Sequence, residues 1–141
     1  MFLLNHAVTG FVLAEGIDNQ WMLYPVALGS HFVLDALPHF GLGEDFTSKK
    51  LVRIGVVDTV VTIVGGLTYV SIFPEKALPA AIAATLSALP DFGWLLKFKG
   101  WAKDNRFFRF HKMIQWGERK YGWIYEAVWT TFMVVLLLHF L

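Results

Sequence analysis

Residues 51–73 form an apolar run, rich in valine and isoleucine, that is long enough to cross a lipid bilayer. Comparable runs occur at residues 78–96 and 123–141, and shorter ones at residues 2–15 and 22–37. The chain is 56% hydrophobic with a mean hydropathy of +0.53, which exceeds the norm for soluble domains. These features predict an all-α fold, an integral membrane bundle of about five helices.

Lysine and arginine are distributed unevenly along the 141 residues, because eight of the twelve lie between Lys97 and Lys120. Positively charged loops stay on the cytoplasmic side of a membrane. We therefore expect one multi-pass domain, residues 1–141, in the inner (cytoplasmic) membrane, with a cytoplasmic N-terminus and an external C-terminus. The last membrane helix is expected at residues 123–141.

The basic segment 97–120 contains a candidate amphipathic helix. Phe107, Phe110 and Ile114 follow helical spacing on one side, and arginine and lysine residues occupy another side. Such a helix is typical of segments that lie on a membrane surface. His111 has helical spacing from Phe107 and Ile114, so we expect its side chain to point toward the bundle.

Residues 34–41 resemble residues 86–93, with six of eight positions identical at a shift of 52 residues. The same shift also pairs potential ligands, namely His6 with Asp58 and His39 with Asp91. This pattern predicts a duplication of two helical hairpins, about residues 2–41 and 54–93, that enter the membrane from the same side. Chance similarity between apolar segments is the alternative.

A His-x3-Asp-x3-His motif, His31, Asp35 and His39, ends the second apolar run. On a helix, His31 and Asp35 share a face. Pro38 predicts a helix break that leaves His39 at the mouth of the site. Two imidazoles and a carboxylate aimed at one point suit zinc or a similar divalent ion, whereas a hydrogen-bonded polar cluster is the alternative.

The predicted topology gathers seven residues with metal-ligand chemistry in the cytoplasmic half of the membrane: His6, His31, Asp35, His39, Asp58, Asp91 and His111. Asp35 and Asp58 interrupt apolar helices, where an unpaired carboxylate is costly and a cation offsets the cost. We therefore predict one or two divalent metal ions, with zinc as the first candidate. A proton relay or a structural polar network is the alternative.

These motifs resemble those of the bacterial membrane-bound metal-dependent hydrolase family, which includes a LexA-binding inner-membrane hydrolase. The shared features are an early histidine, His6, the segment from Ser30-His31 to Asp35, and Leu89-Pro90-Asp91. The family's His-Arg-Gly-x-Thr-His motif is not present. More distantly, the His-x3-Asp-x3-His spacing is similar to the ligand helix of zinc-dependent phospholipase C and the single-strand-specific zinc nucleases, helical enzymes that cleave phosphoesters.

The resemblance and the ligand set imply a membrane-embedded metal-dependent hydrolase, acting on a phosphoester of a lipid or another amphiphile at the cytoplasmic interface. The metal would activate water, and Asp58 or Asp91 would serve as general base. The alternative is a small membrane protein that translocates protons or metal ions through the same cluster. Membrane lipids are the expected partners; a haem protein and a nucleic-acid binder fit the residues poorly.

Overall fold

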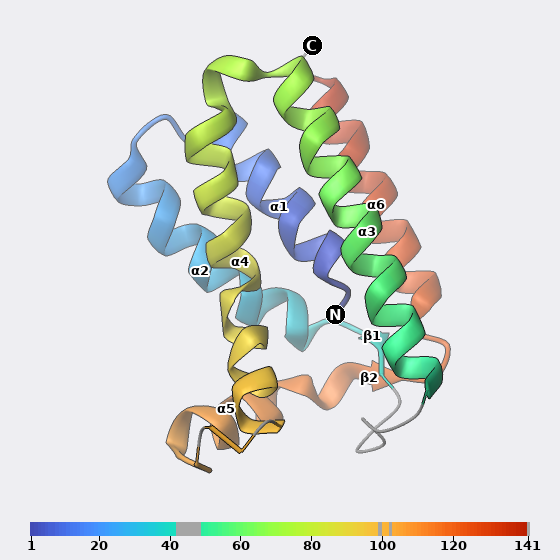
Figure 1. Cartoon of the computed structure of the whole chain (residues 1–141). Helices are drawn as coiled ribbons and strands as arrows, with labels where there is room; N and C mark the ends of the chain where they lie inside the picture. The colour runs from blue at the N-terminus through green and yellow to red at the C-terminus, as the bar shows by residue number, and fades with distance from the viewer. Residues whose placement is uncertain (42–48, 99, 102, 141) are drawn as a thin grey trace.

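The computed structural model describes residues 1–41, 49–98, 100–101 and 103–140, and these residues are mainly helical, as predicted. Two short 3-10 turns and one pair of two-residue strands join the helices (Figure 1). The elements follow in the order α1 (Leu3–Gly16), α2 (Gln20–Ala36), β1 (His39–Phe40), α3 (Lys49–Ile72), η1 (Pro74–Lys76), α4 (Ala77–Phe98), α5 (Arg106–Ile114), η2 (Gln115–Gly117), β2 (Glu118–Arg119) and α6 (Trp123–Leu138).

Helix α1 is the centre of the bundle, because it packs against α2, α3, α4 and α6 (Figure 1). Every residue from Asn5 to Phe11 is buried. A helix that is buried on all sides needs small or apolar residues around its whole circumference, and the apolar run at residues 2–15 supplies them. Three buried residues of this stretch are polar: Asn5 and His6, near the helix start where the candidate site is built, and Thr9, which accepts a hydrogen bond from Trp129.

The closest helix packing joins α1 to α4 at small residues. A methyl group added to Gly10 would lie 2.5 Å from the Ala84 Cα and 2.8 Å from the Ala83 carbonyl carbon. Ala80 and Ala83 are fully buried at this contact. The alanine-rich sequence of α4 therefore lets two backbones approach closely, as small residues do in packed helix pairs.

Replacing Gly10 with alanine is expected to lower the free energy of unfolding by about 1–3 kcal/mol, because the new methyl group meets backbone atoms that cannot move alone. Thermal unfolding in detergent measures the effect. Gly29→Ala is the matched control, since nothing lies within 4 Å of a methyl group on that helical glycine. If both variants unfold like the wild type, the close packing of α1 on α4 is wrong.

The two copies of the Leu-Pro motif adopt different conformations. Helix α2 ends at Ala36, and Leu37, which precedes Pro38, is extended with φ −77° and ψ 157°. Helix α4 instead continues through Pro90 to Phe98. Proline disfavours helix in the residue before it, yet packing overrides this preference in α4. The hairpins α1–α2 and α3–α4 match the predicted repeat units in order, and the duplication itself stays a prediction.

The far ends of the two hairpins are joined by polar contacts. The Lys76 ammonium group donates a 2.8 Å hydrogen bond to the Asp18 carboxylate and bonds the Ala14 and Glu15 carbonyl oxygens. The Tyr69 hydroxyl group donates to the Glu15 carboxylate. The hydrogen bond from Lys76 lowers the pKa of Asp18. These contacts hold the α1–α2 loop beside the α3–α4 turn.

Within the described residues, one stretch is long and apolar enough to span a membrane, Val52–Ile72 of α3. Helix α6 is apolar but shorter. Helices α1 and α2, with 14 and 17 residues, reach only about 21 and 26 Å, less than the roughly 30 Å hydrocarbon core. Helix length and composition therefore do not support the predicted multi-pass protein with five spans, nor do they fix the orientation of its termini.

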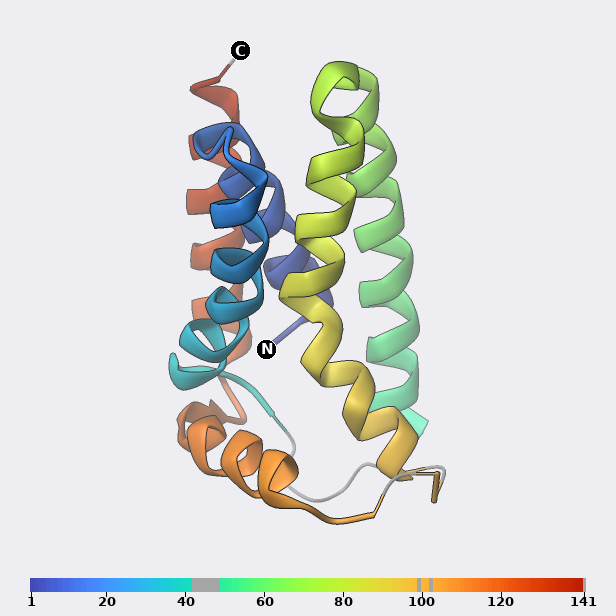
Figure 2. The same ribbon diagram turned by 90° about the vertical axis from the view of Figure 1, so that its left-hand side faces the viewer.

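Helix α5 crosses the end of the bundle beside α2 and α4 (Figure 2). Its buried residues are Phe108 and His111. His111 points inward as predicted, whereas Phe107 and Phe110, from the apolar side of the predicted helix, are 39% and 45% exposed. Phenylalanine occurs on several sides of this helix, and spacing alone could not select the side that packs. Residues 99 and 102 of the basic segment lie outside the described residues.

Candidate metal centre

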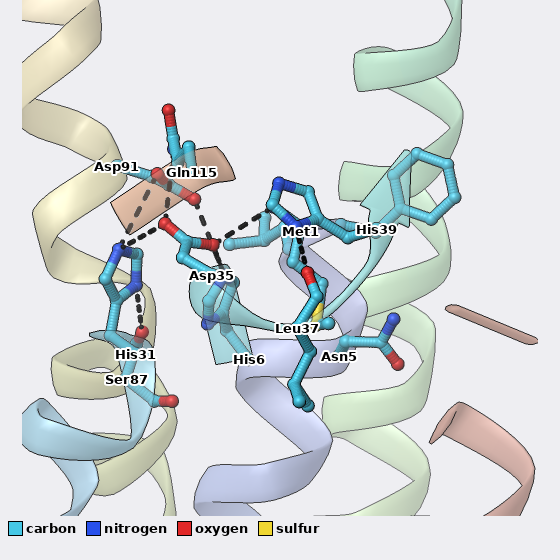
Figure 3. A network of polar contacts seen from close by, with 12 residues as sticks. Met1, Asn5, His6, His31, Asp35, Leu37, His39, Ser87, Asp91 and Gln115 are labelled. Carbon is cyan, nitrogen blue, oxygen red and sulfur yellow. Dashed lines mark hydrogen bonds and ion pairs between the residues drawn. The ribbon is translucent and has the colours of Figure 1, made fainter. Parts of the chain in front are cut away.

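Four side chains with metal-ligand chemistry converge at the α5 end of the bundle. They are His31 and Asp35 of α2, Asp91 of α4 and His111 of α5, and one ligand atom from each lies within 4.8 Å of all the others. The two histidines and Asp35 are completely buried, whereas the Asp91 side chain is 31% exposed. Figure 3 shows His31, Asp35 and Asp91 directed toward one another. The cluster therefore opens at Asp91.

The distances within this cluster suit a four-coordinate ion. His31 Nε2 lies 3.0 Å from His111 Nε2 and 3.2 Å from Asp35 Oδ2, and His111 Nε2 lies 2.8 Å from Asp35 Oδ2. Asp91 Oδ1 lies 3.8 Å from His31 Nε2 and 3.6 Å from His111 Nε2. Ligand atoms placed about 2.0–2.1 Å from a tetrahedral ion are roughly 3.3 Å apart. The measured separations bracket this value.

The surroundings hold His31 in the tautomer that a metal needs. Its Nδ1 lies 2.8 Å from the Ser87 carbonyl oxygen, which can only accept, so Nδ1 carries the proton (Figure 3). The Nε2 lone pair is then directed at Asp35 and His111. Metal-binding histidines commonly donate their second N–H group in this way. The Gln115 amide also donates a 3.2 Å hydrogen bond to Asp35 Oδ2.

His6 of α1 reaches the same two carboxylates from the other side. Its Nε2 lies 3.4 Å from Asp35 Oδ1 and 3.6 Å from Asp91 Oδ2. The ring stacks on His31 with a centroid distance of 4.4 Å. His6 is fully buried, and neither ring nitrogen has a hydrogen-bond partner in the described part of the chain. The Met1 amino group lies 3.1 Å from Asp35 Oδ1.

His39 is buried but is not one of the four converging ligands. Its Nδ1 donates a 2.7 Å hydrogen bond to the Leu37 carbonyl oxygen, and its buried Nε2 has no partner among the described residues (Figure 3). Burial lowers the pKa of His39, so the ring is neutral at pH 7 with a free lone pair on Nε2. Strand β1 holds this ring through its parallel pairing of His39 with Glu118.

Asp58 is also outside the group of converging ligands. Its carboxylate accepts hydrogen bonds from the backbone N–H groups of Leu3, at 2.7 Å, and Leu4, at 3.1 Å. These donors belong to the first turn of α1 and have no partners within the helix. Asp58 therefore acts as a cap supplied by another helix.

Replacing Asp58 with alanine is expected to lower the free energy of unfolding by about 0.5–2 kcal/mol, the usual value of a helix cap, and to leave metal content unchanged. Thermal unfolding and elemental analysis of the same sample measure both quantities. Asp58→Asn keeps one accepting oxygen and should lose less stability. Loss of bound metal from folded Asp58→Ala would instead show that Asp58 contributes to the metal site.

Sequence reasoning missed several polar residues around the site. Glu126 of α6 is buried and accepts hydrogen bonds from Phe2 N, Asn5 Nδ2 and Phe40 N. A carboxylate within the apolar run at residues 123–141 was the available signal. Glu118 is half-buried, and burial raises its pKa. Its position beside β1 depends on the β1–β2 pairing, which the sequence did not reveal.

No family model, curated protein or solved structure matches this chain. The likeness to membrane-bound metal-dependent hydrolases therefore stays a prediction that depends on the motifs alone. The geometry supports a coarser statement, which is that a buried group of two histidines and two aspartates can hold a metal ion.

Proposed function

We propose that this protein is a membrane-embedded hydrolase whose divalent metal ion, with zinc as first candidate, is held by His31, Asp35, Asp91 and His111. The substrate is a phosphoester of a lipid or another amphiphile. The single observation that carries the proposal is the convergence of these four side chains, three of them fully buried, around one point. Buried carboxylates and imidazoles facing one another are stable when a cation is shared among them.

A divalent ion in such a cluster supplies two effects, a lowered pKa of bound water and polarisation of a phosphoryl oxygen. Neighbouring residues of the protein hold the metal ligands in position. Ser87 and Gln115 fix the His31 ring and the Asp35 carboxylate. Asp91 is the exposed edge of the cluster, so a substrate phosphoryl group would arrive beside it. We retain Asp91 in the reacting centre and not Asp58, because both Asp58 oxygens cap α1.

Hydrolysis would join a water oxygen to phosphorus and break the bond from phosphorus to the ester oxygen. One proton of the water goes to a base or to solvent, and the departing alkoxide takes a proton to become the free alcohol. Phosphate or a phosphomonoester is the second product. This balance needs no oxidant, no reductant and no co-reactant other than water.

An apolar groove supports an amphiphilic substrate. It has a volume of about 340 Å³, lies between α1, α3 and α4, and includes Phe11, Leu67, Ala88 and Phe92 in its lining. This volume is within the range of ligand pockets, about 300–1,000 Å³. Ala88 lies one turn before Asp91 on α4, and Phe92 follows Asp91 directly. A hydrocarbon chain in the groove would therefore bring its phosphoester to the exposed edge of the cluster.

Exposed apolar helices support the membrane setting. Val56, Val60, Val64 and Leu67 of α3 are each more than half exposed, and almost none of the Val52–Ile72 stretch is buried against the rest of the chain. A core helix of a soluble protein would be mostly buried. Val128, Phe132 and Val135 expose a similar surface on α6. Lipid is the cover that we propose for both surfaces.

The basic end of the bundle supports a cytoplasmic position for the site. Helix α5 carries Arg106, Arg109 and Lys112 and lies at the same end as the cluster (Figure 2). Its partly exposed Phe107 and Phe110 could enter the headgroup region. Under the positive-inside rule this end faces the cytoplasm.

The test is hydrolysis by metal-loaded, detergent-purified protein. Wild type and His31→Ala are incubated with phosphatidic acid, a polyprenyl phosphate and a phosphatidylglycerol, and released phosphate or alcohol is measured. We expect turnover of at least one substrate by the wild type and loss of that turnover in His31→Ala. A fully metal-loaded wild type that hydrolyses none of them, but carries metal ions or protons into liposomes, would replace the hydrolase with a translocator.

A further inference from the structure

The two carboxylates of the cluster use their oxygens in opposite directions. Asp35 Oδ2 faces His31 and His111, at 3.2 and 2.8 Å, whereas Asp35 Oδ1 faces His6 at 3.4 Å. Asp91 divides in the same way, because Oδ1 faces His31 and His111, at 3.8 and 3.6 Å, and Oδ2 faces His6 at 3.6 Å. Each aspartate therefore lies between His6 on one side and the pair of His31 and His111 on the other.

The two ring nitrogens of His6 are available to bind a cation. The ring is fully buried, and neither nitrogen makes a hydrogen bond with the residues that the structure describes. A buried polar atom without a partner costs about 1–3 kcal/mol, and such atoms are rare in folded proteins. The nitrogen nearest the carboxylates, Nε2, is correctly placed to bind a cation that shares Asp35 Oδ1 and Asp91 Oδ2.

We propose that the cluster binds a second divalent cation, held by His6 Nε2, Asp35 Oδ1 and Asp91 Oδ2, with both aspartates bridging the two ions. This inference rests on the proposed function, whose single ion occupies the side of His31 and His111. Carboxylates that bridge metal ions bind one ion through each oxygen. Two ions about 3.5–4 Å apart stabilise the attacking and the leaving oxygen of a phosphoester together.

One positively charged group already lies on the His6 side of the cluster. Among the described residues, the Met1 amino group is the cation beside Asp35 Oδ1, at 3.1 Å. A second metal ion would compete with this group as the counter-charge of Oδ1. Two divalent ions and two carboxylates leave a net positive centre, which favours an anionic phosphoester over a neutral ester.

The experiment is a Mn²⁺ titration of the detergent-purified full chain, with bound metal counted by elemental mass spectrometry and coupling read by electron paramagnetic resonance. We expect two equivalents in the wild type and a signal from two exchange-coupled ions. His6→Ala should bind one equivalent and give the six-line signal of a single ion. His139→Ala, which changes the exposed histidine that follows α6, should behave like the wild type.

The outcomes separate this inference from the proposed function. One equivalent without coupling in the wild type overturns the second site and leaves the first. No bound Mn²⁺ in the folded wild type overturns both. Because His6→Ala creates a buried space, His6→Leu, which is closer in volume and has no ligand atom, is measured beside it. Two coupled ions in either folded His6 variant would also overturn the inference, since His6 would not be a ligand.

Discussion

Replacing Asp35 with alanine is expected to weaken divalent-metal binding by about 100-fold or more. The Asp35 carboxylate lies closer than that of Asp91 to each of His6, His31 and His111, at 3.4, 3.2 and 2.8 Å, and Gln115 also donates to it. Loss of an outer partner of a metal ligand already costs about 10–100-fold in affinity, and loss of a shared ligand should cost more. Competition with a chromophoric zinc chelator measures the affinity of wild type and variant.

The control for Asp35→Ala is His139→Ala, which should keep the wild-type affinity because His139 lies at the exposed end of α6. Asp35→Asn separates charge from volume, since the amide preserves the size of the side chain but cannot bridge as a carboxylate does. Circular dichroism confirms that each variant is folded. Wild-type zinc affinity in folded Asp35→Ala would contradict the assignment of the centre.

Replacing Glu126 with alanine is expected to lower the free energy of unfolding by about 3–5 kcal/mol, since each buried donor that loses its acceptor costs about 1–3 kcal/mol, and this is the largest loss of stability predicted for any substitution. Its carboxylate accepts hydrogen bonds from Phe2 N at 2.8 Å, Asn5 Nδ2 at 2.6 Å and Phe40 N at 3.0 Å. These bonds join α6 to the start of α1 and to β1. Alanine leaves the N–H groups of Phe2 and Phe40 without this acceptor, and the Asn5 amide keeps only its 3.4 Å bond to the backbone carbonyl oxygen of residue 126.

Chemical denaturation in detergent micelles measures the effect of Glu126→Ala. Glu75→Ala is the matched control, because Glu75 lies exposed in η1 at the other end of the bundle. Glu126→Gln keeps one accepting oxygen and should be intermediate. A folded Glu126→Ala with wild-type stability would show that the contacts between α6, α1 and β1 do not hold this end together.

The helical fold and the main cluster were predictable because the apolar pattern of a helix, and the spacing of the ligands on it, are contained in a short stretch of sequence. Runs of apolar residues predicted helices close to the observed bounds, and the predicted hairpins put the ends of several helices together. His6, His31, Asp35, Asp91 and His111 do meet at one end of the bundle. Helix ends can be read from sequence because turn residues such as Pro38 and Gly16 punctuate the chain.

The face of each helix was harder to predict than its ends. Asp58 lies near the expected end of its helix, but its carboxylate meets the α1 N-terminus and not the imidazoles. Helix α5 buries Phe108, not Phe107 or Phe110, because aromatic residues occur on more than one side. These outcomes depend on how each helix is rotated about its own axis relative to its neighbours. The spacing of residues along the chain does not specify this rotation.

Tertiary packing also decided the backbone conformation at two places where the sequence motif is the same. The motif Leu-Pro-x-Phe-Gly ends α2 at its first occurrence and continues α4 at its second, so identical residues gave different backbone conformations. In α4 the continued helix holds Asp91 beside His6. Glu126 was missed because a lone carboxylate in an apolar run gives no indication of which backbone donors it will meet.

The most direct test of the central claim is the metal content of detergent-purified wild type after dialysis against metal-free buffer. Elemental mass spectrometry should find at least one tightly bound equivalent of a divalent transition metal per chain. Folded His31→Ala should retain less than a tenth of an equivalent, because loss of this ligand should weaken metal binding by about 100-fold or more. A folded wild type that retains no metal, even after loading with zinc or manganese, would contradict the claim that this cluster is a metal centre.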